Sequence, residues 1–150
     1  MGRAQSTAII GFLVTLVLAS TAVLAVNVTT SIDKNAVAPG WTLTVSGTIT
    51  SDDGSPGSFD YRIAVVAPGK SDGGDRIIVC DSKKQSTNGT SNVSLACQIP
   101  TIEGLQQLGV ENAASRFVIP LKGGIAVINP SNNETVKKHV KSMIVNTEKL

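Results

Sequence analysis

Apolar residues follow two different patterns along the chain. From Thr7 to Val26 the sequence reads TAIIGFLVTLVLASTAVLAV, a run of twenty residues without a charged side chain. A helix of that length spans about 30 Å, the thickness of the hydrocarbon core of a bilayer. Beyond this run, apolar and polar residues alternate in short stretches separated by Gly, Pro and Asp, which predicts β-strands. We therefore expect an apolar helix over residues 5–26 and a mainly β domain over residues 27–150.

The stretch Trp41–Thr50 has a clear alternation, with Trp41, Leu43 and Val45 on one face. Gly47 interrupts the stretch and predicts a bulge that keeps Ile49 on the same face. Further strands are expected over Phe59–Ala67, Arg76–Asp81, Val93–Ile99, Arg116–Leu121 and Gly124–Ile128.

Two segments near the end of the chain are less regular. Thr101–Leu108 predicts one or two helical turns, because Ile102, Leu105 and Leu108 recur at a spacing of three. The segment Thr135–Asn146 fits either a helix face or a strand. We favour a strand, because the Pro and Asn residues before it suit the turn of a hairpin.

Turn signals recur about every ten residues, as expected for an antiparallel β-sandwich. The stretch VAPGWTLTVSGTI, Val37 to Ile49, resembles the opening strands of immunoglobulin-like modules on prokaryotic surface proteins. The resemblance implies an immunoglobulin-like sandwich of about seven strands. The chain departs from antibody domains, because Trp41 precedes both cysteines instead of lying between them.

The apolar run has no polar face, so a helix there would need cover on all sides. No other segment predicts a helix that supplies this cover, which argues against a buried core helix. Arg3 is the only charged side chain before the run, and positive charge on that side favours export of everything after Val26. Three fates stay open: an uncut membrane anchor, a secretory signal cleaved between Ala25 and Val26, or cleavage before the run.

Arg3-Ala4-Gln5 followed by the unbroken apolar stretch resembles the leader of archaeal type IV pilins and archaellins. The resemblance implies that residues 1–4 are a leader cut off after Ala4, so that the mature chain begins at Gln5. It also implies that the helix is retained and packs in the core of a filament of identical subunits, after passing through the membrane. Ile9 stands where bacterial pilins carry Glu, so the resemblance is to the archaeal members.

Two further features predict an extracellular, cell-surface location. An even pair of cysteines in an exported chain predicts a disulfide, here between Cys80 and Cys97. Closing a loop of this length would stabilise the fold by about 3 kcal/mol. Asn-X-Ser/Thr sequons, the acceptors of N-glycosylation, occur four times, at Asn27, Asn88, Asn92 and Asn133.

Composition argues against several classes of function. The net charge is +2 with no stripe of Lys and Arg, so nothing favours nucleic acid as a partner. One His and two Cys are too few for a zinc site built from several such ligands. A Gly-x-Ser-x-Gly sequence occurs at Gly69–Gly73, but it lies in a turn between two predicted strands instead of the strand-to-helix turn of a serine hydrolase. Gly73-Gly74 is not followed by the Lys-Ser/Thr of a phosphate-binding loop. We therefore expect no enzyme, no cofactor, no metal and no small-molecule substrate.

Two groups of residues have both a chemical and a plainer interpretation. Asp52-Asp53-Gly54 and Asp72–Asp75 carry carboxylates that suit Ca²⁺. They lack the regularly spaced Asp/Asn ligands and terminal Glu of a twelve-residue Ca²⁺-binding loop, and they are more typical of turns. His139 lies in the basic stretch Lys137–Lys141 with no carboxylate signature nearby, so it is not expected to act as a catalytic base. That stretch could contact anionic headgroups or acidic partners, although such positive charges are more typical of a solvated strand face.

Two functions from different classes fit these features. The first is a structural subunit of an extracellular pilus or archaellum-like filament, assembled without covalent bonds, with a glycosylated sandwich as its outer domain. A variant polymerises by strand addition after cleavage at Ala25, because Val26–Ile32 alternates as a strand. The second is a membrane-tethered or secreted module that binds the cell envelope or other surface proteins.

Overall fold

The computed structural model describes residues 26–51, 58–69 and 76–148, which form nine strands and one short helix. The expectation of a mainly β chain is confirmed, and the described ranges contain no helix long and apolar enough to cross a membrane. The predicted leader and almost all of the predicted helix, residues 1–25, lie outside the described residues. The elements are β1 (Val26–Ile32), β2 (Ala36–Val37), β3 (Thr42–Ser51), β4 (Ser58–Pro68), β5 (Arg76–Asp81), β6 (Gln85–Asn88), β7 (Ser91–Gln98), α2 (Ile102–Leu108), β8 (Val118–Ile128) and β9 (Thr135–Asn146).

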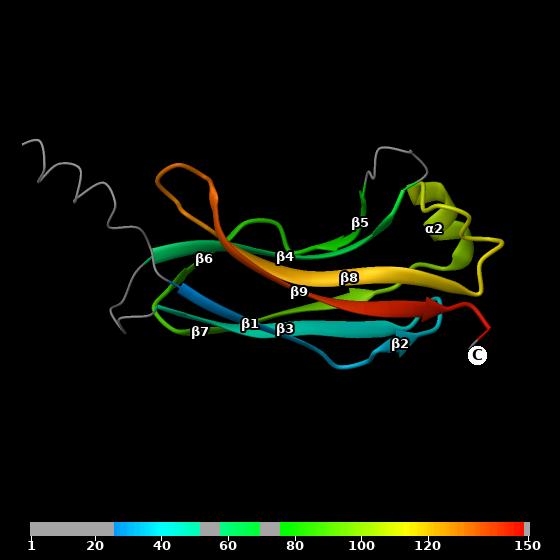
Figure 1. Ribbon diagram of the computed structural model, residues 1–150, viewed down its shortest axis with the longest axis horizontal. Coiled ribbons are helices and arrows are strands. Elements are labelled where there is room, and N and C mark those ends of the chain that lie inside the picture. Colours follow the sequence, from blue (N-terminus) through cyan, green and yellow to red (C-terminus); the bar gives the residue numbers. More distant parts are fainter. Residues whose placement is uncertain (1–25, 52–57, 70–75, 149–150) are drawn as a thin grey trace, which may run out of the picture.

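The strands form two sheets that pack face to face as a sandwich (Figure 1). One sheet has three strands in the order β1-β3-β7, and the other has the order β2-β9-β8-β4-β5 with β6 also paired to β4. The expectation of about seven strands, all antiparallel, is wrong in two respects. The described residues form nine strands, and β2 runs parallel to β9, with Ala36 opposite Ile144. Two of the strands that were not expected are short: β2 has two residues and β6 has four.

The core lies between the sheets and follows the period of two that places alternate side chains on one face of a strand. In β1, buried and exposed residues alternate from Val26 onward. Leu43 and Val45 of β3 and Ile63 of β4 are fully buried. The largest buried side chains include Phe59, Leu43, Ile49, Ile63, Ile99, Leu105, Ile119, Leu121 and Ile125.

The bulge expected at Gly47 is absent, because β3 pairs with β1 and β7 in unbroken register through this residue. Ile49 is an even number of residues from Leu43 and Val45, so it faces the same side of β3 and no register shift is needed to bury it. Gly47 is required for a different reason. A Cβ atom there would lie 1.9 Å from the carbonyl oxygen of Thr29 and 2.5 Å from Cδ1 of Ile125.

Trp41 is not part of the core, contrary to the expectation that it shares the inner face with Leu43. It precedes β3, in a turn where its N–H donates to the carbonyl of Ala38 at 3.1 Å. Gly40 takes a left-handed φ of 86° in this turn, a conformation that glycine adopts without strain. The Trp41 residue is therefore 39% exposed.

The two strands expected over Arg116–Leu121 and Gly124–Ile128 are one strand, β8. Lys122 and Gly123 continue its pairing with β9 instead of forming a turn. Gly123 leaves room for Met143, because a Cβ there would lie 2.8 Å from its Cε and 3.1 Å from Cγ2 of Val45. The hairpin expected for the final segment is confirmed, since β9 pairs antiparallel with β8.

The predicted helical turns form α2. Thr101 caps its start, with its hydroxyl oxygen accepting from the N–H of Gly104 at 3.2 Å, and Gly109 ends it with φ 95°. Leu105 is buried, whereas Leu108 is 43% exposed at the end of the helix.

A disulfide joins Cys80 in β5 to Cys97 in β7, with a Cα–Cα distance of 5.8 Å. Because β5 belongs to the six-stranded sheet and β7 to the three-stranded sheet, the bond links the two layers. It lies on the side of the sandwich where β5 is the last strand of its sheet.

Candidate functional site

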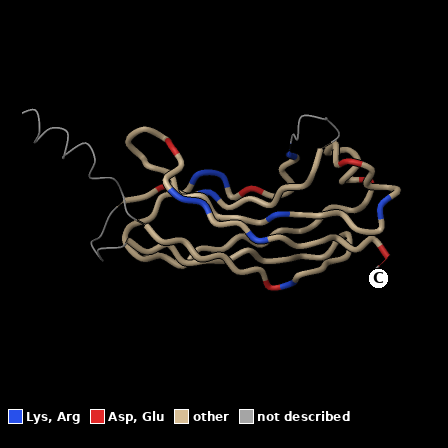
Figure 2. Tube along the Cα trace, viewed as in Figure 1, with Lys and Arg blue, Asp and Glu red and all other residues tan. Residues whose placement is uncertain are grey.

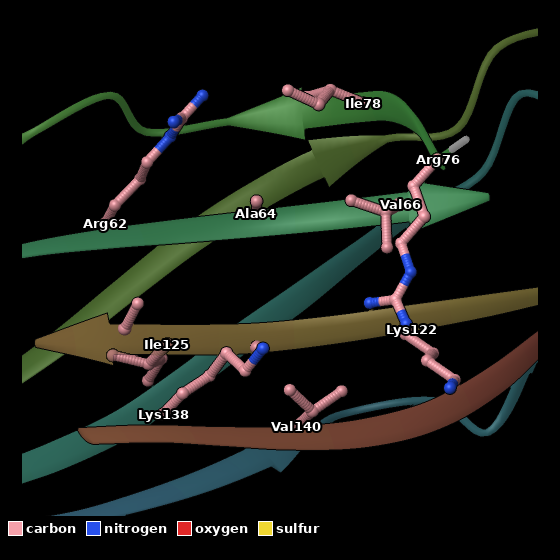
Figure 3. A pocket seen from close by; sticks show the side chains of 11 residues that line it. Arg62, Ala64, Val66, Arg76, Ile78, Lys122, Ile125, Lys138 and Val140 are labelled. Atoms are coloured by element: carbon pink, nitrogen blue, oxygen red, sulfur yellow. The ribbon is translucent and has the colours of Figure 1, made fainter. Parts of the chain in front are cut away.

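The outer face of the six-stranded sheet carries a shallow groove of about 240 Å³ (Figure 3). We call this hollow the basic groove, because cationic side chains of four strands surround an apolar floor. Its lining residues on that face are Arg62, Ala64, Val66, Arg76, Ile78, Lys122, Gly124, Ala126, Lys138 and Val140.

The register of the strands arranges these residues in rows across the sheet. At one end of the groove, Arg62 of β4 lies opposite Ala126 of β8, which lies opposite Lys138 of β9. At the other end, Val66 of β4 lies opposite Lys122 of β8. Ala126 and Lys122 are four residues apart on one strand, so the two rows are separated by about 13 Å.

The hollow arises because the middle of the floor has small side chains. Ala64 of β4 pairs with Gly124 of β8, which pairs with Val140 of β9. A Cβ at Gly124 would lie 2.9 Å from Cγ2 of Val140, so the glycine also keeps this floor flat. Ile78 and Val140 leave apolar surface in the groove, being 46% and 39% exposed.

Only one of the four cations is neutralised by a described residue. Arg62 donates from Nε to Oδ1 of Asp81 at 2.8 Å and forms an ion pair through its second nitrogen. This hydrogen bond from Arg62 lowers the pKa of Asp81, and the same contact raises the pKa of Arg62. The remaining cations, Arg76, Lys122 and Lys138, form no ion pair with any described acid.

Figure 3 shows the Arg76 guanidinium reaching past Val66 toward the side of the groove where Lys122 lies. Two positive groups on one side of a hollow repel each other, and an anion placed between them would remove that repulsion. The groove therefore has the charge and the apolar floor to bind an acidic group that carries apolar surface.

Sequence reasoning identified only Lys138 among these cations, as part of the basic stretch Lys137–Lys141. It missed Arg62, Arg76 and Lys122, each of which is a lone cation within its own strand. Their proximity results from cross-strand register. His139 is exposed on β9, where its carbonyl accepts from the hydroxyl of Thr30 at 3.1 Å.

The predicted sequons gather at one end of the sandwich. We call it the proximal end, because β1 begins there. The end of β3 and the start of β4 lie at the same end, since Val26 pairs with Ser51 and Asp60 pairs with Ile128. Opposite to it is the α2 end, which also holds the C-terminal part of β9 (Figure 1). All four acceptors are exposed. Asn27 lies at the start of β1, Asn92 at the start of β7, Asn88 at the end of β6 and Asn133 in the β8–β9 turn.

The remaining predicted sites fall outside the described residues or do not assemble. The processing residues Arg3, Ala4, Gln5 and Ala25 and the loops containing Asp52-Asp53 and Asp72–Asp75 lie outside the described part. Val26 is described, as the buried first residue of β1. Across the three described ranges, no three His, Cys, Asp or Glu side chains come together as metal ligands.

No protein-family model matches the chain, and no curated protein matches it. Solved structures with a similar fold include a Paenibacillus cycloisomaltooligosaccharide glucanotransferase (TM-score 0.47, 11% identity, 79% of this chain and 13% of that chain). Another is the Bacillus subtilis sporulation control protein Spo0M, with a TM-score of 0.46 and 12% identity over 84% of this chain and 51% of that chain. A third is the CARDB domain of a Pyrococcus furiosus protein, with a TM-score of 0.47 and 10% identity over 85% of this chain and 100% of that chain. The chain thus spans 13% and 51% of the first two structures. With TM-scores under 0.5 and identities of 10–12%, these similarities support no conclusion about this chain.

Proposed function

We propose that the chain is a structural subunit of an extracellular cell-surface filament of the pilus or archaellum type. Cleavage after Ala4 would leave a helix beginning at Gln5, which packs against its copies in the filament core. The sandwich forms the outer domain. This function needs no catalytic group, cofactor or metal.

The observation that carries this proposal is that the apolar run of the sequence extends to the first residue of β1. The apolar run ends at Val26, and Val26 is the first residue of β1 and only 3% exposed. A flexible linker gives a displayed domain reach and freedom. No polar linker sequence separates the apolar run from β1, which suits subunits whose outer domains must all take the same position around a core.

The strand order supports the finer assignment to an immunoglobulin-like sandwich. β1-β3-β7 and β4-β8-β9 correspond to the A-B-E and C-F-G strands of that fold. The disulfide differs from that of antibody domains, which joins strands B and F. Here it joins β5 and β7.

A second candidate function is a membrane-tethered or secreted module that binds the cell envelope or other surface proteins. The basic groove favours it, because unneutralised cations around exposed apolar residues are suited to an acidic partner. The strand-addition variant of polymerisation would require β1 to leave its place beside β3 of its own chain.

Arg3→Glu in the cells that make the protein tests the filament proposal. Removing the positive charge before the cut should block processing and abolish filaments, whereas Arg3→Lys should leave both unchanged. Normal filaments and a normal amino terminus in the Glu variant would contradict the proposal.

A further inference from the structure

One corner of the same chain is opposite in charge to the basic groove. We call Ile102–Glu111 the α2 corner; it contains Glu103 and Glu111 and no Lys or Arg. Both acids are exposed and form no ion pair with a described residue. Between them in sequence lies Leu108, 43% exposed. Figure 2 shows acidic positions beside α2 and basic positions along the strands of the six-stranded sheet.

The groove has the composition of a protein interface more than that of a small-molecule site. Its apolar floor is rimmed by charged side chains, the usual arrangement of a protein–protein contact. Its volume of about 240 Å³ is below the roughly 300–1,000 Å³ of sites that enclose small ligands. An occupant must therefore extend beyond the hollow and bring acids to its rim.

The α2 corner cannot occupy the groove of its own chain. Val110 bridges to Gly69, the residue after the end of β4, and a Cβ atom at Gly109 would lie 3.6 Å from Cδ1 of Ile77. Ile77 and Ile78 are neighbours in β5 and so point to opposite faces of the sheet. The corner is therefore held on the inner side of β5, whereas the groove lies on the outer side.

We propose that the basic groove receives the α2 corner of a second copy of this chain. Leu108 covers the apolar floor near Val140, and the two glutamates face the unpaired cations. The inference rests on the proposed filament and names one of its subunit contacts. Because the two surfaces differ, a growing assembly always has one free groove at one end and one free corner at the other. When the rotation between successive subunits does not close a ring, such a contact produces an open filament.

The position of the sequons agrees with this contact. All four acceptors lie at the proximal end, whereas neither the residues lining the groove nor the α2 corner contain an acceptor Asn. Glycans are bulky and solvated, so the surfaces without them are the ones free to pack.

The test uses the full chain expressed in cells that assemble it, with filament yield measured by sedimentation and electron microscopy. Lys122→Glu with Lys138→Glu reverses two cations in the groove. The matched control, Lys137→Glu with Lys141→Glu, makes the same change of charge at positions on the opposite face of β9. Glu103→Lys with Glu111→Lys reverses the corner, and the fourth variant combines the groove and corner reversals. Thermal melting of each purified chain verifies folding.

We expect each reversal alone to lower filament yield at least about tenfold, the control to resemble the wild type, and the combined variant to recover filaments. Normal filaments from the folded groove variant would overturn this inference and leave the proposed function standing. Loss without recovery in the combined variant would exclude the α2 corner as the occupant and point to another acidic partner. A wild-type chain that never forms filaments would overturn both proposals.

Discussion

Gly47 in β3 lies beneath Ile125 in β8, so that the side chain from one sheet fills the space left by a missing side chain in the other. A Cβ atom on Gly47 would lie 2.5 Å from Cδ1 of Ile125 and 1.9 Å from the carbonyl oxygen of Thr29. Both contacts are far inside van der Waals distance, and the second is to the backbone of the neighbouring strand. The close approach of β1, β3 and β8 thus depends on this glycine.

Gly47→Ala is expected to destabilise the sandwich by about 1–3 kcal/mol, the usual cost of overpacking a core. Thermal melting should show a fall of several degrees in Tm. Ser46→Ala, at the adjacent position on the outer face of β3, is the control. It removes only an exposed hydrogen bond to the Ser31 hydroxyl and should change Tm much less. Equal Tm values for Gly47→Ala and the wild type would contradict the packing described here.

Replacing both cysteines, Cys80→Ser with Cys97→Ser, should lower the free energy of unfolding by about 3 kcal/mol, because the bond closes a 17-residue separation. Denaturant unfolding under oxidising conditions measures this difference. Adding reductant should bring the wild type close to the double variant. An unchanged wild-type stability after verified reduction would show that the link between the sheets does not stabilise the fold.

The ion pair between Arg62 and Asp81 predicts a pH-dependent stability. The hydrogen bond from Arg62 lowers the pKa of Asp81 from its usual 3.8, so folding favours the ionised carboxylate. This contribution is fully present above the unfolded pKa and is lost as the pH falls through the lower, folded pKa. Arg62 is 44% exposed, so the contribution is at most about 1 kcal/mol.

Asp81→Asn should therefore reduce Tm modestly at pH 7, and its difference from the wild type should shrink as the pH falls below about 4. Melting curves from pH 7 to pH 2 measure this convergence. A difference that is constant over the whole range would mean that ionisation of Asp81 is not its cause.

Glycosylation at the proximal end can be tested without disturbing the backbone. Asn133 has a left-handed φ of 61°, so replacing the Asn itself would strain the β8–β9 turn. Thr135→Ala removes this sequon instead and should lower the mass of the native protein by one glycan with little change in Tm. Thr135→Ser keeps the sequon and should retain the glycan. Identical glycan content for the wild type and Thr135→Ala would show that Asn133 is not modified.

Much of the fold could be predicted from local pattern. The alternation in Trp41–Thr50 and Phe59–Ala67 identified β3 and β4, because side chains of successive residues point to opposite faces. The apolar spacing of Thr101–Leu108 identified α2. Prediction from local pattern was wrong where a glycine is explained by a residue distant in sequence. Gly123 was interpreted as part of a turn, but it makes room for Met143 within a continuous strand. β6, Gln85–Asn88, was missed because it contains no apolar residue.

The basic groove could not be predicted because its residues are brought together by register. Arg62 and Lys138 lie in one row only because both oppose Ala126, a relationship that no local spacing encodes. Lys138 was noticed because it has cationic neighbours in sequence, although Lys137 and Lys141 do not line the groove. The sequence thus indicated that β9 is basic, but it did not show that Lys138 belongs to the basic groove.

The amino terminus of the native protein, measured by mass spectrometry after deglycosylation, tests the proposed filament function most directly. A chain that begins at Gln5 is the predicted result, because it retains the apolar helix for the filament core. A chain that begins at Val26 would lack the helix, and one that begins at Met1 or Gly2 would be an uncut anchor. Either of these results would contradict a pilin-type subunit.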